Sequence, residues 1–133
     1  MSNPRLELGA AGEQLAAAHL ERAGYRILAR NVRAGGVEMD LVAARGRLRA
    51  FVEVKTRRGR SHGHPAEAVD RRKQARLLRG ATAWLREHPL RGGRVRFDVV
   101  TVELHPDGSS ELLHWPGAFD ASDAEWTRTP GGR

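Results

Sequence analysis

Two alternating runs, residues 37–43 and 48–56, constrain the fold of this 133-residue chain more than any other feature. The first run places Val37, Met39 and Leu41 opposite Glu38, Asp40 and Val42, and the second places Leu48, Ala50, Val52 and Val54 opposite Arg49, Phe51, Glu53 and Lys55. A period of two is typical of β-strands. Because only four residues separate the runs, they predict an antiparallel hairpin. The register, and with it whether Asp40 lies beside Glu53, stays open.

The rest of the chain predicts two helices and three further strands. Residues 6–23 are rich in Ala, Leu and Glu, with Leu8, Ala11, Leu15, Ala18 and His19 at helical spacing. A second helix is predicted from about residue 66, after Pro65, to residue 87. Strands are predicted at 25–32, 95–104 and 111–115. The order helix, three strands, helix, two strands is typical of a layered α/β domain with a mixed sheet between helices. We expect one domain over 1–120 and a flexible tail over 121–133.

The net charge of +7 is concentrated in one stretch of the chain. Residues 55–79 contain nine Lys or Arg and only two acidic residues, which accounts for the whole excess. A local basic field of this kind favours a polyanionic partner, with nucleic acid first. The alternative is a solvated helix face in an arginine-rich protein.

Several classes of protein are not favoured by the composition. The absence of cysteine argues against a disulfide framework and a thiolate metal site. We found no signal-peptide pattern and no apolar run near the roughly 20 residues that span a bilayer. We therefore expect a bacterial cytoplasmic protein with no membrane partner.

Asp40, Glu53 and Lys55 form the most informative set of side chains. Glu53 and Lys55 share one face of their predicted strand, and Asp40 lies on the preceding strand. Carboxylates on adjacent strands bind hard divalent cations such as Mg²⁺, and a neighbouring lysine can orient the attacking water. The plain alternative is a surface Glu/Lys pair, which stabilises little.

Lysine is rare in this chain, since 21 of its 23 basic residues are Arg and only Lys55 and Lys73 are Lys. Lysine is a compact charge whose pKa burial can lower, whereas a guanidinium stays protonated. The two lysines therefore indicate positions where an arginine could not perform the same role. The alternative is that both are lysine by chance. Lys73 either contacts phosphate or only extends its stem along the apolar stripe.

The chain resembles the YraN-like family of small bacterial proteins with a restriction-endonuclease-like fold. The matching segments are GEQLAAAHLERAGYRILARN, EMDLVA, FVEVKTR, the helix start at 67–73 and RFDVV. That family is similar in turn to the PD-(D/E)xK nucleases, including archaeal Holliday-junction resolvases. Two departures are visible: Met39 stands where the nuclease signature has proline, and Val37 precedes Glu38 where the family usually has glycine.

The resemblance implies a three-layer nuclease domain with a metal site. Asp40 and Glu53, with Val54 counted among the metal contacts, would hold Mg²⁺ or Mn²⁺, and Lys55 would assist the water. Glu13 would complete the acidic site as in the resolvase-like members. The expected phosphate contacts are Arg57, Arg58, Arg60, Arg72, Lys73 and Arg76. Resolvase-like nucleases are usually dimers, so a homodimer is also expected.

We therefore predict a metal-dependent endonuclease acting on DNA rather than RNA, with branched DNA as the candidate substrate. The competing hypotheses are a catalytically inactive nucleic-acid-binding protein that retains the fold and an adaptor with an acidic protein partner. The roles of Glu38, His62, His64 and Asp98 stay open. Glu38 could be a third carboxylate or an arginine partner, and Asp98 could be a buried partner for Arg96.

Overall fold

The computed structural model describes residues 4–59 and 70–119 and confirms the predicted order of helices and strands. The elements are α1 (Pro4–Arg22), β1 (Arg26–Ala34), β2 (Val37–Arg45), β3 (Leu48–Arg58), α2 (Arg71–Glu87), β4 (Arg94–Leu104) and β5 (Ser110–Phe119). The sequence therefore predicted each element, with ends that differ by a few residues.

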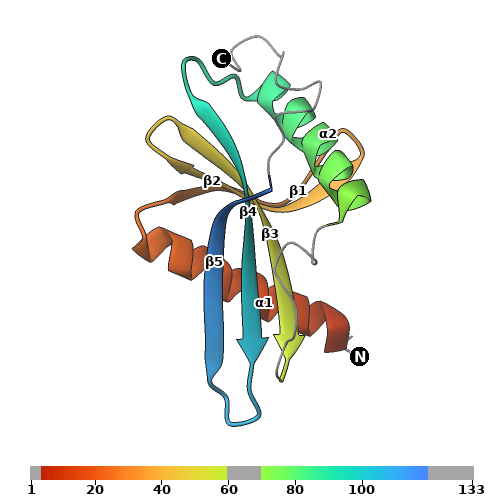
Figure 1. Ribbon diagram of the computed structural model, residues 1–133, viewed down its shortest axis with the longest axis vertical. Helices are drawn as coiled ribbons and strands as arrows, with labels where there is room; N and C mark the ends of the chain where they lie inside the picture. The colour runs from red at the N-terminus through yellow and green to blue at the C-terminus, as the bar shows by residue number, and fades with distance from the viewer. Residues whose placement is uncertain (1–3, 60–69, 120–133) are drawn as a thin grey trace.

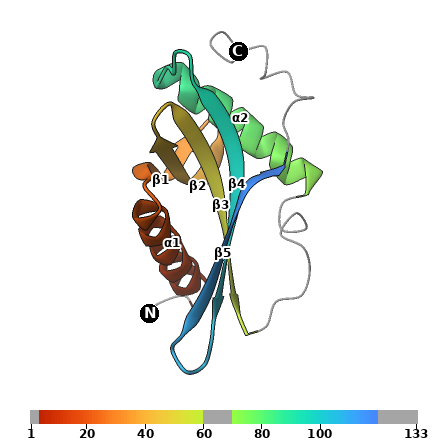
Figure 2. The same cartoon turned by 60° about the vertical axis from the view of Figure 1, so that its left-hand side comes forward.

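One mixed sheet forms the middle of the molecule, with strand order β1-β2-β3-β4-β5. The pair β3–β4 is parallel and the other pairs are antiparallel. A parallel pair needs a crossover connection, and α2 lies in the segment that joins β3 to β4. The two helices cover opposite faces of the sheet, which gives three layers (Figure 1 and Figure 2). This arrangement confirms the predicted α/β class.

Each face of the sheet has its own apolar cluster. On β3, alternate residues Leu48, Ala50 and Val52 belong to the cluster beneath α1, whereas Phe51 belongs to the cluster beneath α2. Because strand side chains alternate between faces, Glu53 and Lys55 follow Phe51 on the α2 face. The alternation predicted for β3 is therefore confirmed.

The alternation predicted for β2 was wrong. Val37 and Met39 pack in the cluster beneath α2, whereas Leu41 packs in the cluster beneath α1. Val37, Met39 and Leu41 were predicted to share one face, but they divide between the two faces of the sheet. The change of face occurs around Asp40, where β2 continues beside β1 but its pairing with β3 has ended.

The residues that α1 buries fully are not the ones that the helical spacing singled out. The fully buried apolar residues of α1 are Ala16, Ala17 and Leu20, while Leu15 is 37% exposed. Small side chains let this helix approach the sheet closely. At Gly12 the approach is closest, because a Cβ there would overlap the side chain of Thr56 on β3. Close packing, rather than the number of large apolar residues, decides which face of α1 is buried.

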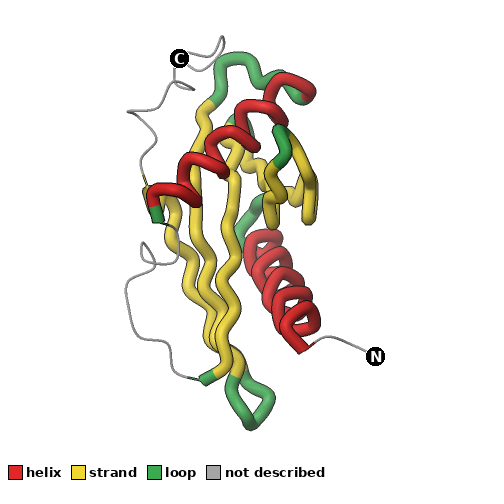
Figure 3. Tube along the Cα trace, turned by 90° about the vertical axis from the view of Figure 1, so that its right-hand side faces the viewer, coloured by secondary structure: helices red, strands yellow, loops and turns green. Residues whose placement is uncertain are grey.

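The second helix begins later than predicted. Asp70 has extended backbone angles and its side chain accepts a hydrogen bond from the Lys73 amide at 2.9 Å, which makes it the N-cap of α2. The predicted helical start at 66–69 and the predicted tail at 121–133 lie outside the described residues. The helices cover different parts of the sheet, with α2 towards one end and α1 towards the other (Figure 3).

Candidate metal and phosphate site

The candidate site begins where β2 separates from β3. Backbone pairing between these strands ends at Leu41 and Val52, so the next residues of β3 have no direct partner on β2. The Val54 amide donates instead to the Asp40 carboxylate, at 2.8 Å between the nitrogen and Oδ2. The carboxylate thus replaces a strand partner, and its position relative to β3 is set by a main-chain hydrogen bond.

Glu53 is the second acidic residue of the site. It is buried, with 8% of its surface exposed, and its Oε2 lies 2.7 Å from the Nζ of Lys73 on α2. This ion pair links β3 directly to the first turn of α2. Lys73 was predicted as a phosphate contact, and the structure places its ammonium group on the carboxylate that was predicted to bind metal.

Glu13 reaches the same site from α1. Its carboxyl is hydrogen-bonded to the Asn31 side chain, and it is hydrogen-bonded to Asp40 when one of these two carboxyls holds a proton. The contact of Gly12 with Thr56 explains how the helix comes close enough for this. Asn31 lies on β1 with a φ of 49°, a left-handed conformation that asparagine tolerates better than most residues. Sequence reasoning did not single out Asn31, and nothing in the pattern of alternation points to it.

The electrostatics of the site favour uptake of a cation. Burial raises the pKa of Asp40 from 3.8 to about 7, and the charges of Glu53 and Glu13 add to the effect. The amide of Val54 and the charge of Lys73 act in the opposite direction. Burial also raises the pKa of Glu13. A divalent cation between such carboxylates would relieve their repulsion.

The carboxylates of the candidate site are ligands of the chemical type that binds Mg²⁺. Within residues 4–59 and 70–119, no group of three or more His, Asp or Glu side chains is arranged to hold a metal ion as it stands. Mg²⁺ is commonly held by one or two carboxylates, with waters and substrate phosphate as the other ligands. Asp40 and Glu53 match that requirement. The side chain of Val54 packs against the α1 cluster, so this residue offers the ion only its main-chain oxygen.

The predicted cations divide between β3 and α2. Lys55 lies two residues after Glu53 and is half-buried, as is Arg57, whereas Arg58, Arg72 and Arg76 are exposed. The first turn of α2 contains no acidic residue. Arg60, His62 and His64 lie outside the described residues. Glu38 is exposed, and its charge contributes to the raised pKa of Glu13.

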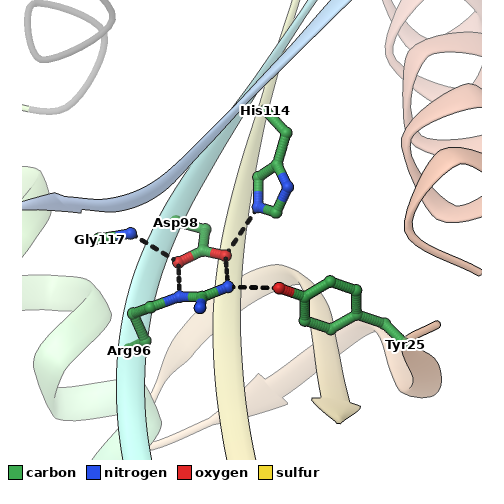
Figure 4. Close-up of polar contacts among 5 residues, drawn as sticks. All are labelled: Tyr25, Arg96, Asp98, His114 and Gly117. Carbon is green, nitrogen blue, oxygen red and sulfur yellow. Dashed lines mark hydrogen bonds and ion pairs between the residues drawn. The ribbon is translucent and has the colours of Figure 1, made fainter. Parts of the chain in front are cut away.

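A second buried carboxylate, Asp98 on β4, lies in a different environment. Figure 4 shows its side chain surrounded by Arg96, His114 and the amide of Gly117. Nε and Nη2 of Arg96 each lie 2.8 Å from it, Nε2 of His114 lies at 2.8 Å and the Gly117 amide at 3.0 Å. Nη2 of Arg96 also donates to the Tyr25 hydroxyl at 2.7 Å. The predicted pairing of Asp98 with Arg96 is therefore present.

These contacts explain why the pKa of Asp98 is lowered, whereas that of Asp40 is raised. Burial acts to raise the pKa, but hydrogen bonds from His114, Arg96 and Gly117 outweigh it and hold the pKa below 3.8. The same carboxylate raises the pKa of Arg96. Asp98 is fully buried and fully hydrogen-bonded, which is the pattern of a structural ion pair.

Comparison with known proteins identifies relatives along most of the chain. The sequence model of "Uncharacterised protein family UPF0102" matches residues 12–102. A UPF0102 protein of Syntrophotalea carbinolica is 49% identical over 120 residues, covering 90% of this chain and 97% of the relative. A UPF0102 protein of Symbiobacterium thermophilum is 54% identical over 114 residues, covering 86% and 97%. Neither helix of the described part of the chain combines the length and apolar character that crossing a bilayer requires.

Proposed function

The chain belongs to the uncharacterised protein family UPF0102, and we propose that it is a metal-dependent endonuclease that hydrolyses phosphodiester bonds in DNA. The observation that carries this proposal is the pair of acidic side chains where β2 leaves β3. Asp40 is tied to the Val54 amide, and Glu53 is buried beside it with a cation against its oxygen. A carboxyl with a strongly raised pKa, such as that of Asp40, is typical of functional sites.

The residues have distinct roles in this proposal. Asp40 and Glu53 hold Mg²⁺ or Mn²⁺, with the main-chain oxygen of Val54 as a further donor. When bound, the ion polarises the phosphate and lowers the pKa of a coordinated water. Lys55, on the same face as Glu53, orients that water or stabilises developing charge. Glu13 completes the acidic site through its hydrogen bond to Asp40.

The basic residues supply the affinity for the phosphate backbone. Three exposed cations lie on the two elements that carry Glu53 and Lys73. They are Arg58 at the end of β3 and Arg72 and Arg76 on α2. Phosphate contacts of this kind give an affinity that falls steeply with salt concentration. Arginine also binds phosphate with two parallel hydrogen bonds, which favours a nucleic-acid backbone over a diffuse acidic partner.

The likeness of the sequence to resolvase-like nucleases makes the proposed substrate and the proposed assembly more specific. We propose branched DNA as the substrate and a cytoplasmic homodimer as the working form. A dimer presents two active sites to two strands, which suits a four-way junction with its symmetry.

The test is calorimetric titration with Mn²⁺, followed by a cleavage assay on duplex and four-way DNA. We expect the wild type to bind Mn²⁺ and to cut DNA, and Asp40→Ala and Glu53→Ala to lose both properties. The matched control is Glu87→Ala, which removes an exposed carboxylate at the far end of α2. Wild-type protein that does not bind Mn²⁺, even with DNA present, would contradict the proposal.

A second candidate function is nucleic-acid binding without hydrolysis. The observation that favours it is the ion pair itself, because Lys73 already neutralises Glu53 and no three-ligand set is formed by the described residues. This alternative predicts salt-sensitive DNA binding that persists in Asp40→Ala and Glu53→Ala, with no cleavage by any variant. The same two assays therefore separate the candidates.

A further inference from the structure

The ammonium group of Lys73 contacts a carboxylate, that of Glu53, which a metal ion at the candidate site would also contact. Its Nζ lies 2.7 Å from Oε2 of Glu53. The glutamate side chain is 11% exposed, whereas the lysine side chain is 41% exposed. The lysine is thus held at one end by a buried carboxylate and is otherwise open to solvent. A flexible four-carbon stem allows its charged end to move without rearrangement of the helix.

A divalent ion and Lys73 would compete for the same carboxylate. A bound divalent ion brings two positive charges beside Glu53 and Asp40, and the local field changes from negative to neutral or positive. The attraction that holds the lysine at Glu53 would then be lost, and repulsion by the ion would replace it. A bound divalent ion would therefore weaken the ion pair between Lys73 and Glu53.

The surroundings of Lys73 favour an anion as its next partner. The first turn of α2 contains Arg71, Arg72 and Lys73 and no acidic residue. Positive side chains at this end of a helix are unfavourable, because the backbone there already carries partial positive charge. A phosphate group near this turn would offset the repulsion among these basic side chains. The nearest carboxylate of this turn, that of the N-cap Asp70, already accepts a hydrogen bond from the Lys73 amide.

We propose that Lys73 is an exchangeable cation, paired with Glu53 in the metal-free protein and released to a nucleic-acid phosphate when a divalent ion binds. This inference rests on the proposed function, because it assumes the metal site and the nucleic-acid substrate. Its consequence is a positive coupling between the two ligands. Each ligand strengthens the binding of the other by the same factor. The protein therefore binds its substrate best when the site is loaded.

The first measurement is calorimetric titration with Mn²⁺ alone, on wild type, Lys73→Met and Arg72→Met. Methionine keeps most of the lysine stem while removing its charge. We expect Lys73→Met to bind Mn²⁺ about fivefold more tightly than wild type, since no competing ammonium remains. Arg72→Met removes one charge from the adjacent position and should change the affinity by less than about twofold.

The second measurement is the affinity for a phosphorothioate DNA duplex, which resists hydrolysis, with and without Mn²⁺. With Mn²⁺, Lys73→Met should bind about fivefold more weakly than wild type, and its salt dependence should fall by the equivalent of about one phosphate contact. Without Mn²⁺, Lys73→Met should lose no more affinity than Arg72→Met. The control variant should lose the same factor under both conditions.

The outcomes separate this inference from the proposed function. If the wild type binds no Mn²⁺, both fail. If Asp40→Ala abolishes Mn²⁺ binding but Lys73→Met binds Mn²⁺ no better than wild type, the metal site stands and the exchange is overturned. If Lys73→Met binds Mn²⁺ more weakly, Lys73 positions Glu53 instead of competing for it, which also overturns the exchange. A loss of DNA affinity that is equal with and without Mn²⁺ has the same consequence.

Discussion

Two aspartates lie on the strands that flank β3, Asp98 fully buried on β4 and Asp40 partly exposed on β2, and their surroundings differ. Asp98 on β4 receives hydrogen bonds from a guanidinium, an imidazole and an amide. Asp40 on β2 receives one from a backbone amide, and its other neighbours include Glu13 and Glu53. The pKa of the first carboxyl is lowered and that of the second is raised to about 7.

This difference teaches how a buried charge can be assigned a role. A buried ionised group is costly unless partners satisfy it. Asp98 is satisfied within the chain, so its contribution is to hold β4, β5 and Tyr25 together. Asp40 lacks a comparable set of donors, so an external cation beside it would lower the free energy of its ionised form. The two aspartates should therefore respond in opposite ways to substitution.

The largest effect is expected at Asp98. Asp98→Asn leaves the guanidinium of Arg96 half-buried without its carboxylate and turns an amide NH₂ towards other donors. We expect the free energy of unfolding to fall by about 3 kcal/mol, measured by urea denaturation at pH 7. As a control, Glu87→Gln on the exposed end of α2 should stay within about 0.5 kcal/mol of wild type. If Asp98→Asn lowers the free energy of unfolding by less than about 1 kcal/mol, the structural role inferred for Asp98 is contradicted.

The next effect, of opposite sign, is expected at Asp40. Asp40→Asn keeps an acceptor for the Val54 amide and removes the repulsion by Glu53 and Glu13. In metal-free protein at pH 8, we expect the free energy of unfolding to rise by about 2 kcal/mol while Mn²⁺ binding is lost. A destabilised Asp40→Asn protein would mean that Asp40, like Asp98, is a structural residue.

The dependence on pH sharpens this prediction. The pKa of Asp40 is 3.8 as a free side chain and about 7 in the folded protein, so between these values the folded state holds a proton that the unfolded chain has released. The contribution of Asp40 therefore makes stability fall as pH rises from about 4 to 7. The advantage of Asp40→Asn should shrink towards pH 4. Asp98 acts in reverse, because its lowered pKa makes its contribution disappear as pH falls below about 4.

The smallest effect is expected at Tyr25. Tyr25→Phe removes the hydroxyl that accepts from Nη2 of Arg96 but keeps the buried ring, which also lies beneath the guanidinium of Arg45. We expect a loss of about 1 kcal/mol in the free energy of unfolding, measured by the same denaturation series. The double variant with Asp98→Asn should lose less than the sum of the two single losses, since the three side chains form one network. Additive losses would show that Tyr25 acts independently of Asp98.

The sequence by itself determined the order of the elements and the faces of β3. A period of two is a local property, and it placed Glu53 and Lys55 on one face of β3 and Ala50 and Val52 on the other, without reference to distant residues. It also singled out Asp40, Glu53 and Lys55 by their chemical types. The resemblance to known nucleases added Glu13, which helical spacing alone would leave as an exposed residue.

The tertiary structure decided which of these side chains meet. The contact of Asp40 with Val54 depends on β2 leaving β3, and the change of face between Met39 and Leu41 defeats a simple alternation. The pairing of Glu53 with Lys73 depends on where the segment between β3 and α2 returns the chain to the sheet. The buried face of α1 depends on how closely Gly12 approaches Thr56. Strand register, helix docking and side-chain pairing are long-range properties, because each is set by the free energy of contacts between residues far apart in the chain.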